Sequence, residues 1–272
     1  VKRIIPGLFI PRKGHVFVMG DFAAIECRVL AYLAGCKKML SAFEHDKDIY
    51  KEMAASLYRI SAMDVSKKQR QIGKALILGR GYGMGNDKFR AYAETYGVKI
   101  SEEESMLSGA AYKKAYPEIP AFWSACEQAF EMAWTKKQVV QVGHVIFKGY
   151  ASYVKISLPT GRDLYYHLPQ YDRRQLSIMD YRNKCRKDIW AGVIVENITQ
   201  AIARDILDDR IKMLIHNGIY VAAHIHDEIV CEVPQDKQQA EIIFSILNTP
   251  PKWFPGFPLK TEIETNAKRY HK

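Results

Sequence analysis

Residues 16–28 read VFVMGDFAAIECR. The apolar run at 16–19 predicts a short buried strand that ends at Gly20-Asp21. Residues 23–34 then place apolar side chains on one helical face and stop at Gly35, so we expect a helix there. A strand end in a sheet holds a carboxylate rigidly and leaves it open to solvent, which makes Asp21 a candidate functional residue.

A second acidic position lies far along the chain, where residues 219–234 form two strand-like runs around His226-Asp227-Glu228. If these strands are neighbours of the strand at 16–19, Asp21 and Asp227 converge. Two converging carboxylates form a hard-oxygen site that suits Mg²⁺ together with waters and substrate phosphates. Alternatively, Asp-Glu in a hairpin is simply turn chemistry. The residues alone leave both interpretations open.

The rest of the chain supplies helices first and strands later. Residues 36–135 are rich in helical patterns, whereas residues 139–166 are β-branched and aromatic with turn signals. A long amphipathic helix is expected at 193–215, a further helix at 236–247 and a last strand at 259–264. Strands and helices do not alternate as βαβ units, so the predicted fold class is α+β with an antiparallel sheet.

A basic segment precedes a cluster of glycines. Arg70, Lys74, Leu78 and Tyr82 are spaced by four, which places them along one face if the segment is a helix. Two cations one turn apart suit a triphosphate, and an aromatic residue offers a stacking surface for a base. The alternative is a solvated basic helix with an apolar underside. The following glycines do not form a phosphate loop of the GxxxxGK[ST] kind.

Composition and charge limit the class of protein. The chain has 272 residues, 48% hydrophobic and 26% charged, which excludes a disordered tail, a collagen-like repeat and a disulfide miniprotein. The net charge of +10 favours a phosphate-rich partner, either nucleic acid or nucleotide. Residues 172–188 carry six basic residues against three Asp, which predicts either a solvated face or a DNA contact.

The cysteines and the absence of long apolar runs bear on location. No apolar run approaches the ~18 residues that a membrane helix needs, and the start is not a signal peptide, so no membrane association is expected. The five cysteines are odd in number and show no CxxC spacing, which argues for a reducing compartment. We therefore expect a cytoplasmic protein.

Taken together, these segments resemble family A DNA polymerases, the bacterial DNA polymerase I family. Residues 21–28 are similar to the family's D-Y-S-x-I-E-L-R, and Arg70-x3-Lys74-x7-Tyr82-Gly83 looks like its R-x3-K-x7-Y-G helix. Residues 226–234 match V-H-D-E-x-x-x-E-V-P from His226 onward, and residues 200–205 are a weaker match to a fourth motif. Variant details such as Leu78 look more like the phage-encoded members, and a phage-encoded protein is expected in the host cytoplasm.

The resemblance implies a right-hand architecture with an antiparallel palm sheet and helical fingers. Residues 1–30 and 191–272 would form the palm. Residues 31–190 would form the fingers, with the nucleotide-binding helix at 66–80. The thumb is expected to be absent from this chain. We expect the thumb and any exonuclease region to lie on the same longer polypeptide or on a second chain.

The implied reaction is template-directed addition of dNTPs to the 3′-OH of a primer, with primer–template DNA as partner and two Mg²⁺ ions, or Mn²⁺ in their place. The resemblance gives catalytic roles to Asp21, Asp227, Lys74 and Glu228, and metal binding to Asp21, Phe22 (through its carbonyl) and Asp227. It assigns nucleotide binding to Arg70, Lys74, Leu78, Tyr82, Glu26 and Tyr50, and DNA binding to Gln200, His226 and Arg28. The alternatives are a single-subunit RNA polymerase-like enzyme and a non-catalytic DNA-binding polymerase module.

Overall fold

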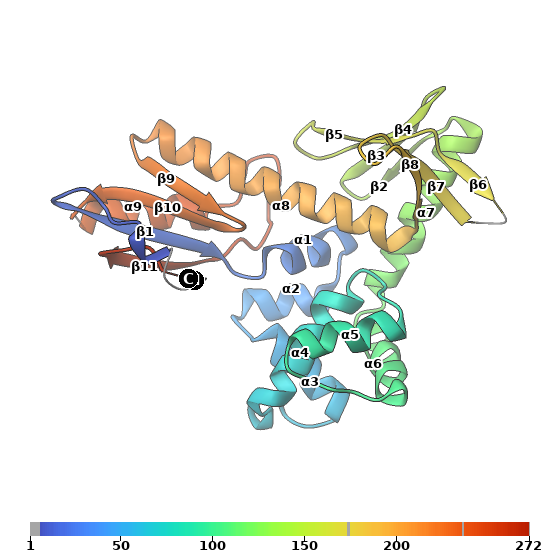
Figure 1. The fold of residues 1–272 in the computed structure, drawn as a ribbon, viewed down its shortest axis with the longest axis horizontal. Helices are drawn as coiled ribbons and strands as arrows, with labels where there is room; N and C mark the ends of the chain where they lie inside the picture. The colour runs from blue at the N-terminus through green and yellow to red at the C-terminus, as the bar shows by residue number, and fades with distance from the viewer. Residues whose placement is uncertain (1–5, 173–174, 236, 272) are drawn as a thin grey trace. The chain divides into compact units, whose positions relative to one another are not determined.

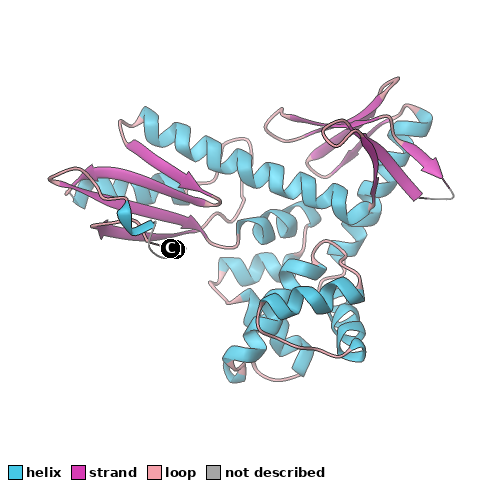
Figure 2. Cartoon of the chain, viewed as in Figure 1, coloured by secondary structure: helices cyan, strands magenta, loops and turns pink. Residues whose placement is uncertain are grey.

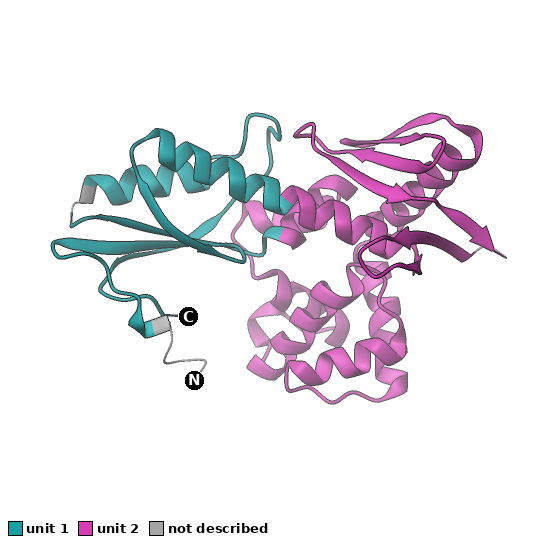
Figure 3. Cartoon of the chain, turned by 45° about the horizontal axis from the view of Figure 1, so that its top comes forward, with its two compact units in different colours: residues 1–25, 203–272 teal, residues 26–202 magenta. Residues whose placement is uncertain are grey.

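The computed structural model describes residues 6–172, 175–235 and 237–271, so Arg173 and Arg174 of the basic segment lie outside the described residues. The chain divides into two compact units (Figure 3). Unit 1 combines residues 1–25 with 203–272, and unit 2 comprises residues 26–202. Helices and antiparallel strands coexist in both (Figure 2), which confirms the predicted α+β class.

Unit 1 is built on a four-stranded antiparallel sheet with the order β11-β1-β10-β9 (Figure 1). The strands predicted at 16–19, 219–234 and 259–264 are all present. The last of these begins and ends slightly later than expected. The bounds are β1 (His15–Phe22), β9 (Tyr220–Ile225), β10 (Glu228–Pro234) and β11 (Thr261–Ala267), with a short 3₁₀ helix η1 (Pro6–Leu8) before them.

The two faces of this sheet differ. One face packs against α9 (Lys237–Asn248), and the approach is so close at Gly20 that a Cβ there would lie 2.4 Å from Cδ1 of Leu247. Because side chains alternate along a strand, Asp21 belongs to the opposite face. That face carries a smaller apolar cluster of Phe17, Met19, Val230, Ala267 and Tyr270. The candidate carboxylate therefore extends a row of buried apolar residues.

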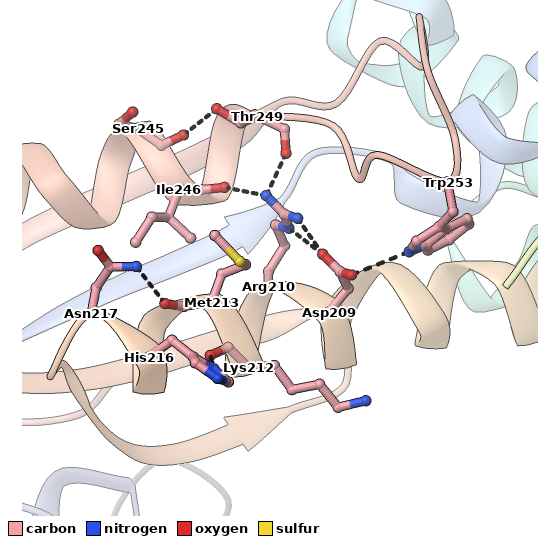
Figure 4. Close-up of polar contacts among 10 residues, drawn as sticks. All are labelled: Asp209, Arg210, Lys212, Met213, His216, Asn217, Ser245, Ile246, Thr249 and Trp253. Atoms are coloured by element: carbon pink, nitrogen blue, oxygen red, sulfur yellow. Dashed lines mark hydrogen bonds and ion pairs between the residues drawn. The ribbon is translucent and has the colours of Figure 1, made fainter.

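The long helix α8 (Ala191–His216) confirms the helix predicted at 193–215, and its residues from Ala203 onward belong to unit 1. There Arg210, only 5% exposed, donates to the carbonyls of Ile246 (3.2 Å) and Thr249 (2.8 Å) at the end of α9 (Figure 4). A cation suits the unsatisfied carbonyls of a helix C-terminus. Asp209 pairs with Arg210 and accepts from Nε1 of Trp253 at 3.2 Å, which fixes α8 to α9.

Unit 2 contains the helix-rich region that the sequence predicts. Ser66 and Ser101 start two of its helices with capping boxes, in which each serine accepts from a backbone amide and a Gln or Glu side chain reciprocates. The helices are α1 (Ile25–Ala34), α2 (Lys37–Glu44), α3 (Ile49–Tyr58), η2 (Ala62–Asp64), α4 (Lys67–Arg80), α5 (Asn86–Thr95), α6 (Glu102–Ala115) and α7 (Glu118–Lys136). The predicted helix at 66–80 is α4.

Unit 2 also contains two antiparallel sheets, one with the order β2-β3-β4-β5 and one with the order β6-β7-β8. The first confirms the strands predicted at 139–166, and its inner face packs on α7, where Phe130 meets Tyr166 edge-on. The second forms from the basic segment, for which no strand was predicted. The bounds are β2 (Val139–Val142), β3 (Val145–Gly149), β4 (Tyr153–Ser157), β5 (Asp163–His167), β6 (Gln170–Asp172), β7 (Gln175–Asp180) and β8 (Cys185–Ile189).

Candidate active site

The two candidate carboxylates of unit 1 lie at the same end of neighbouring strands. The amide of Phe22 donates to the carbonyl of Asp227 at 3.1 Å, which closes the ladder between β1 and the turn before β10. Asp21 is consequently opposite Glu228 in a pair without mutual hydrogen bonds, the arrangement that brings facing side chains closest. The sequence predicts that Asp21 and Asp227 converge if their strands are neighbours, and β1 and β10 are neighbours.

Glu228 is buried, at 6% exposed, and its Oε2 accepts a hydrogen bond of 2.8 Å from the hydroxyl of Tyr270. Burial raises the pKa of Tyr270 to about 12, and the hydrogen bond and charge of Glu228 and the charge of Asp21 add to this effect. The charges of both carboxylates therefore act on the pKa of this one tyrosine. Nothing in the sequence pattern singled out Tyr270, because it lies outside every motif.

The backbone beside these carboxylates is unusual. Ala24 has φ +50° in the connection between β1 and α1, and His226 has φ +55° in the turn that contains Asp227. Non-glycine residues rarely adopt this region, and alanine gains no local side-chain hydrogen bond there. Such conformations cluster at functional sites because the surrounding fold must hold them in place. The backbone that follows Asp21 and the turn that contains Asp227 are therefore held in conformations set by the tertiary structure.

The donor set of this region fits a hard divalent cation. It offers the carboxylates of Asp21 and Asp227 and the carbonyl of Phe22, all oxygen atoms of the kind that Mg²⁺ prefers. Among residues 6–172, 175–235 and 237–271, no three His, Cys, Asp or Glu side chains group into a cage that could hold a metal. Mg²⁺ is characteristically bound by one or two carboxylates plus waters and phosphates, which agrees with this sparse set.

In unit 2, Arg70 of α4 is held by an acidic residue that the sequence analysis missed. Nε of Arg70 lies 2.5 Å from Oδ2 of Asp48. The other carboxylate oxygen of Asp48 accepts from the amides of Tyr50 (3.0 Å) and Lys51 (3.2 Å) and so caps the start of α3. An acidic residue just before an apolar helical stretch is an N-cap signal, but its pairing with Arg70 depends on tertiary structure.

Tyr50 and Tyr96 surround the cations of α4. The ring of Tyr50 lies 5.2 Å from the guanidinium of Arg70 and 5.7 Å from Nζ of Lys74, and Tyr96 lies 5.8 Å from the same Nζ. Burial raises the pKa of Tyr50, so it stays neutral. The helices α3 and α4 touch closely at Gly73, where a Cβ would come within 2.0 Å of the carbonyl oxygen of Tyr50.

Tyr82 lies just beyond the helix predicted at 66–80, so its spacing of four from Leu78 does not by itself place it on a face of α4. The helix α4 ends at Arg80, and residues 81–83 form a turn in which Gly83 has φ +72°. The hydroxyl of Tyr82 donates to Oε2 of Glu26 at 3.4 Å. Burial, followed by the charge of Glu26, raises the pKa of Tyr82 well above its ordinary value. Two nucleotide-binding candidates are thus brought together.

A pocket of about 530 Å³ opens beside this turn, within unit 2. Its wall includes Gly83, Trp123 and Trp190, and the indole nitrogen of Trp123 donates to the carbonyl of Gly81 at 3.0 Å. Concave sites with aromatic walls and a few polar groups are the usual form of small-ligand pockets.

Comparisons with known proteins agree with the geometry of both units. Residues 1–143 match the sequence profile of DNA polymerase family A. The chain belongs to family A of the DNA polymerases. It is 30% identical over 275 residues to the DNA polymerase of Bacillus phage SP02, covering 96% of this chain and 42% of that protein.

Other family A relatives show the same pattern of coverage. DNA polymerase I of Borreliella burgdorferi is 24% identical, with 97% of this chain and 26% of that protein covered. The structure of the POL domain of Pol1 from M. smegmatis, in complex with DNA primer-template and dNTP, aligns with a TM-score of 0.65 at 20% identity. That alignment covers 95% of this chain and 41% of the other. The chain spans less than half the length of these relatives, and the structural match shows a polymerase fold.

The DNA-binding candidates of this family A chain fall into two groups. Gln200 and His226 are exposed. Arg28 is 6% exposed, and its guanidinium lies 4.3 Å from the ring centroid of Phe43, while burial lowers its pKa. A cation that contacts a phosphate backbone must reach solvent, so the structure gives no support to Arg28 as a DNA contact.

Within the part of the polymerase chain that the structure describes, no helix combines the length and the apolar character needed to span a bilayer.

Proposed function

We propose that this chain contains the palm and fingers of a DNA polymerase that adds dNTPs to a primer 3′-OH under the direction of a template. The palm comprises residues 1–30 and 191–272, and the fingers comprise residues 31–190. The observation that carries the proposal is the placement of Asp21 and Asp227 at the same end of adjacent strands, joined by the hydrogen bond from Phe22 to Asp227. Family membership supports the same activity.

In this proposal Asp21, Asp227 and the carbonyl of Phe22 hold two Mg²⁺ ions, for which Mn²⁺ can substitute. When bound, such a pair of ions stabilises the attacking and leaving oxygens of an in-line displacement. A ligand set of two carboxylates and one carbonyl leaves coordination positions for the triphosphate. Glu228 and His226 lie beside Asp227 in the sequence and approach the primer end.

The helix α4 supplies the nucleotide site. Arg70 and Lys74 bind the triphosphate through charge-assisted hydrogen bonds, and Lys74 is the acid placed to protonate the departing pyrophosphate. Leu78 packs against the sugar and base. Tyr50 keeps both cations near an aromatic face, within 5.7 Å. Asp48 holds Arg70 in place until the more highly charged triphosphate competes for it.

The turn after α4 sets sugar selection and template contact. Glu26 excludes a ribose 2′-hydroxyl, and the hydrogen bond from Tyr82 fixes that carboxylate. Tyr82 stacks beside the template, and Gln200, exposed on α8, approaches the template strand. Most of the catalytic work in this proposal is positioning and charge stabilisation.

The test is primer extension with Mg²⁺, run in parallel with dNTPs and rNTPs. Asp21→Asn and Asp227→Asn remove a charge without changing shape, and each is expected to lower the rate by at least about a hundredfold. Asp64→Asn, an exposed acidic residue of η2, is the matched control and should extend at the wild-type rate. Extension by either Asn variant at the control rate would contradict the proposal.

The remaining outcomes separate the alternatives. Preferential use of rNTPs would favour the single-subunit RNA polymerase-like enzyme. No extension and no Mg²⁺-dependent dNTP binding would favour the non-catalytic module. Binding of dNTP without extension would indicate that activity needs further polypeptide, on the same chain or on a second one.

A further inference from the structure

The positive charge of the chain is concentrated in the β-rich part of unit 2. Residues 137–189 contain ten Lys or Arg and four Asp, with no Glu, and therefore supply +6 of the net +10. The proposed nucleotide and metal sites use none of these residues. A basic region of this density points to a phosphate-bearing partner.

The sheet β2-β3-β4-β5 presents one face to α7 and the other to solvent. Val154 and Ile156 of β4 pair with Tyr166 and Leu164 of β5, and both residues of β4 are fully buried. The alternating positions point outward, where Tyr153 pairs with His167 and Lys155 pairs with Tyr165. The outer face thus carries aromatic and basic side chains where an ordinary solvated sheet would carry small polar ones.

Five rings on this outer side form a continuous chain, which we call the aromatic platform: Tyr150, Tyr153, Tyr165, His167 and Tyr181. Successive centroids are 4.7 Å (Tyr150–Tyr153), 5.5 Å (Tyr153–Tyr165), 6.4 Å (Tyr165–His167) and 5.2 Å (His167–Tyr181) apart. Tyr165 is 52% exposed and Tyr181 60% exposed. Tyr165 on β5 and Tyr181 in the turn after β7 are therefore the rings of this chain that are most open to solvent.

Lysines accompany the rings. Lys148 of β3 is directly opposite Lys155 of β4, and like charges in that position disfavour the sheet. Asp163 neutralises Lys155 at 3.1 Å, whereas Nζ of Lys148 lies 5.1 Å from the ring of Tyr150. An anionic ligand would relieve the repulsion at Lys148 beside a stacking surface.

We propose that the aromatic platform binds single-stranded DNA, with bases stacked on Tyr165 and Tyr181 and the phosphate backbone beside Lys148. Exposed aromatic rings next to cations are the means by which proteins bind unpaired nucleic acid without sequence preference. A duplex hides its base faces and cannot stack there. The choice of DNA over RNA rests on the proposed function.

The test measures equilibrium binding of a labelled 16-nucleotide oligo(dT) to the full chain by fluorescence anisotropy, without primer or dNTP. Tyr165→Leu and Tyr181→Leu keep apolar bulk but remove the ring, and each should weaken binding about fivefold or more. Tyr220→Leu, at 58% exposed on β9, is the matched control and should bind like the wild type. Lys148→Gln should reduce the slope of log affinity against log salt by about 0.7.

Wild-type affinity in both ring variants, with an unchanged thermal midpoint, would overturn the proposal. An equal loss of affinity for oligo(dT) and for a duplex of the same length in the two ring variants would also overturn it, because a duplex cannot stack on the platform. Primer extension with the same preparations separates this inference from the proposed function. If the wild type extends primers while both ring variants bind oligo(dT) as tightly as the wild type, only the platform proposal is contradicted. If the wild type does not extend primers but its oligo(dT) binding depends on Tyr165 and Tyr181, only the proposed polymerase activity is contradicted.

Discussion

The hydroxyl of Tyr270 donates a 2.8 Å hydrogen bond to the carboxylate of Glu228, the first residue of β10 and the neighbour of Asp227. Tyr270 follows β11, and its amide donates to the carbonyl of Phe9 at 2.9 Å. The segment after β11 is thereby tied to the carboxylate hairpin. The position of Glu228 depends on a residue far outside the sequence motif that contains it.

Tyr270→Phe tests this tether. Loss of a hydrogen bond to a buried charged group should lower the free energy of unfolding by about 1–3 kcal/mol, measured by urea denaturation. In primer extension it should lower kcat more than it raises KM for dNTP, because Glu228 is displaced while α4 is untouched. Tyr220→Phe, whose residue is exposed, is the control. Equal effects on kcat and KM would argue against a role at the primer end.

Gly73→Ala should destabilise the protein even though alanine is the better helix former. A Cβ at this position would lie 2.0 Å from the carbonyl oxygen of Tyr50, so α3 and α4 must separate. Overpacking of this kind costs about 1–3 kcal/mol, which outweighs a propensity gain of about 1 kcal/mol. The separation should also weaken dNTP binding, since it moves Arg70 and Lys74 relative to Tyr50.

Gly7→Ala is the control for this change, because nothing lies within 4 Å of the added methyl group and the backbone there has an ordinary φ. Thermal unfolding compares the two variants directly. A midpoint for Gly73→Ala at or above that of Gly7→Ala would show that the helices accommodate the methyl group.

Tyr82→Phe tests the link between the turn after α4 and sugar selection. The change removes the O–H group that donates to Glu26 at 3.4 Å. The ratio of kcat/KM for dNTP over rNTP should fall about threefold to tenfold, the worth of one hydrogen bond. Tyr166→Phe, which removes a hydroxyl bonded to Asn197 instead, should leave the ratio unchanged. A fall of the same size in both variants would assign the effect to stability.

The cysteines should differ sharply in reactivity. Burial raises the pKa of four thiols to about 12, so they stay protonated at pH 8: Cys27, Cys36, Cys126 and Cys231. Cys185 is exposed at the start of β8. Titration with a disulfide reagent at pH 8 should show one fast thiol in the native protein and five after unfolding. Cys185→Ser should abolish the fast phase, and a fast phase that survives would mean that a buried thiol is accessible.

The fold of unit 1 follows from local pattern, because the apolar run at 16–19 and the paired runs at 219–234 have strand periodicity and turn residues at their ends. The same pattern places Asp21 and Asp227 at strand ends, so their proximity was predictable once the strands paired. The metal, nucleotide and DNA roles of these residues stay predictions.

Other features depend on tertiary contacts that no spacing reveals. Tyr82 lies in the turn after α4, where Gly83 has a positive φ, and its contact with Glu26 could not be read from its spacing. Arg28 reads as a surface cation, yet the structure packs it over Phe43. Asp48 caps α3 by a recognisable local rule, but its partner Arg70 comes from another helix. The strands of the basic segment could not be predicted from apolar alternation, because nearly every residue of β8 is exposed and polar.

Unit 1 is assembled from the two ends of the chain, and this has a consequence for its synthesis. Its central strand β1 pairs with β10 on one side and β11 on the other, and both are made about 200 residues later. On the ribosome, Asp21 emerges long before Asp227, and the whole of unit 2 is translated between them. Because such distant strands pair late, a chain cut short by a frameshift or a protease before β10 retains α4 and its cations but has no paired carboxylates. Under the proposed function, such truncated copies would lack polymerase activity.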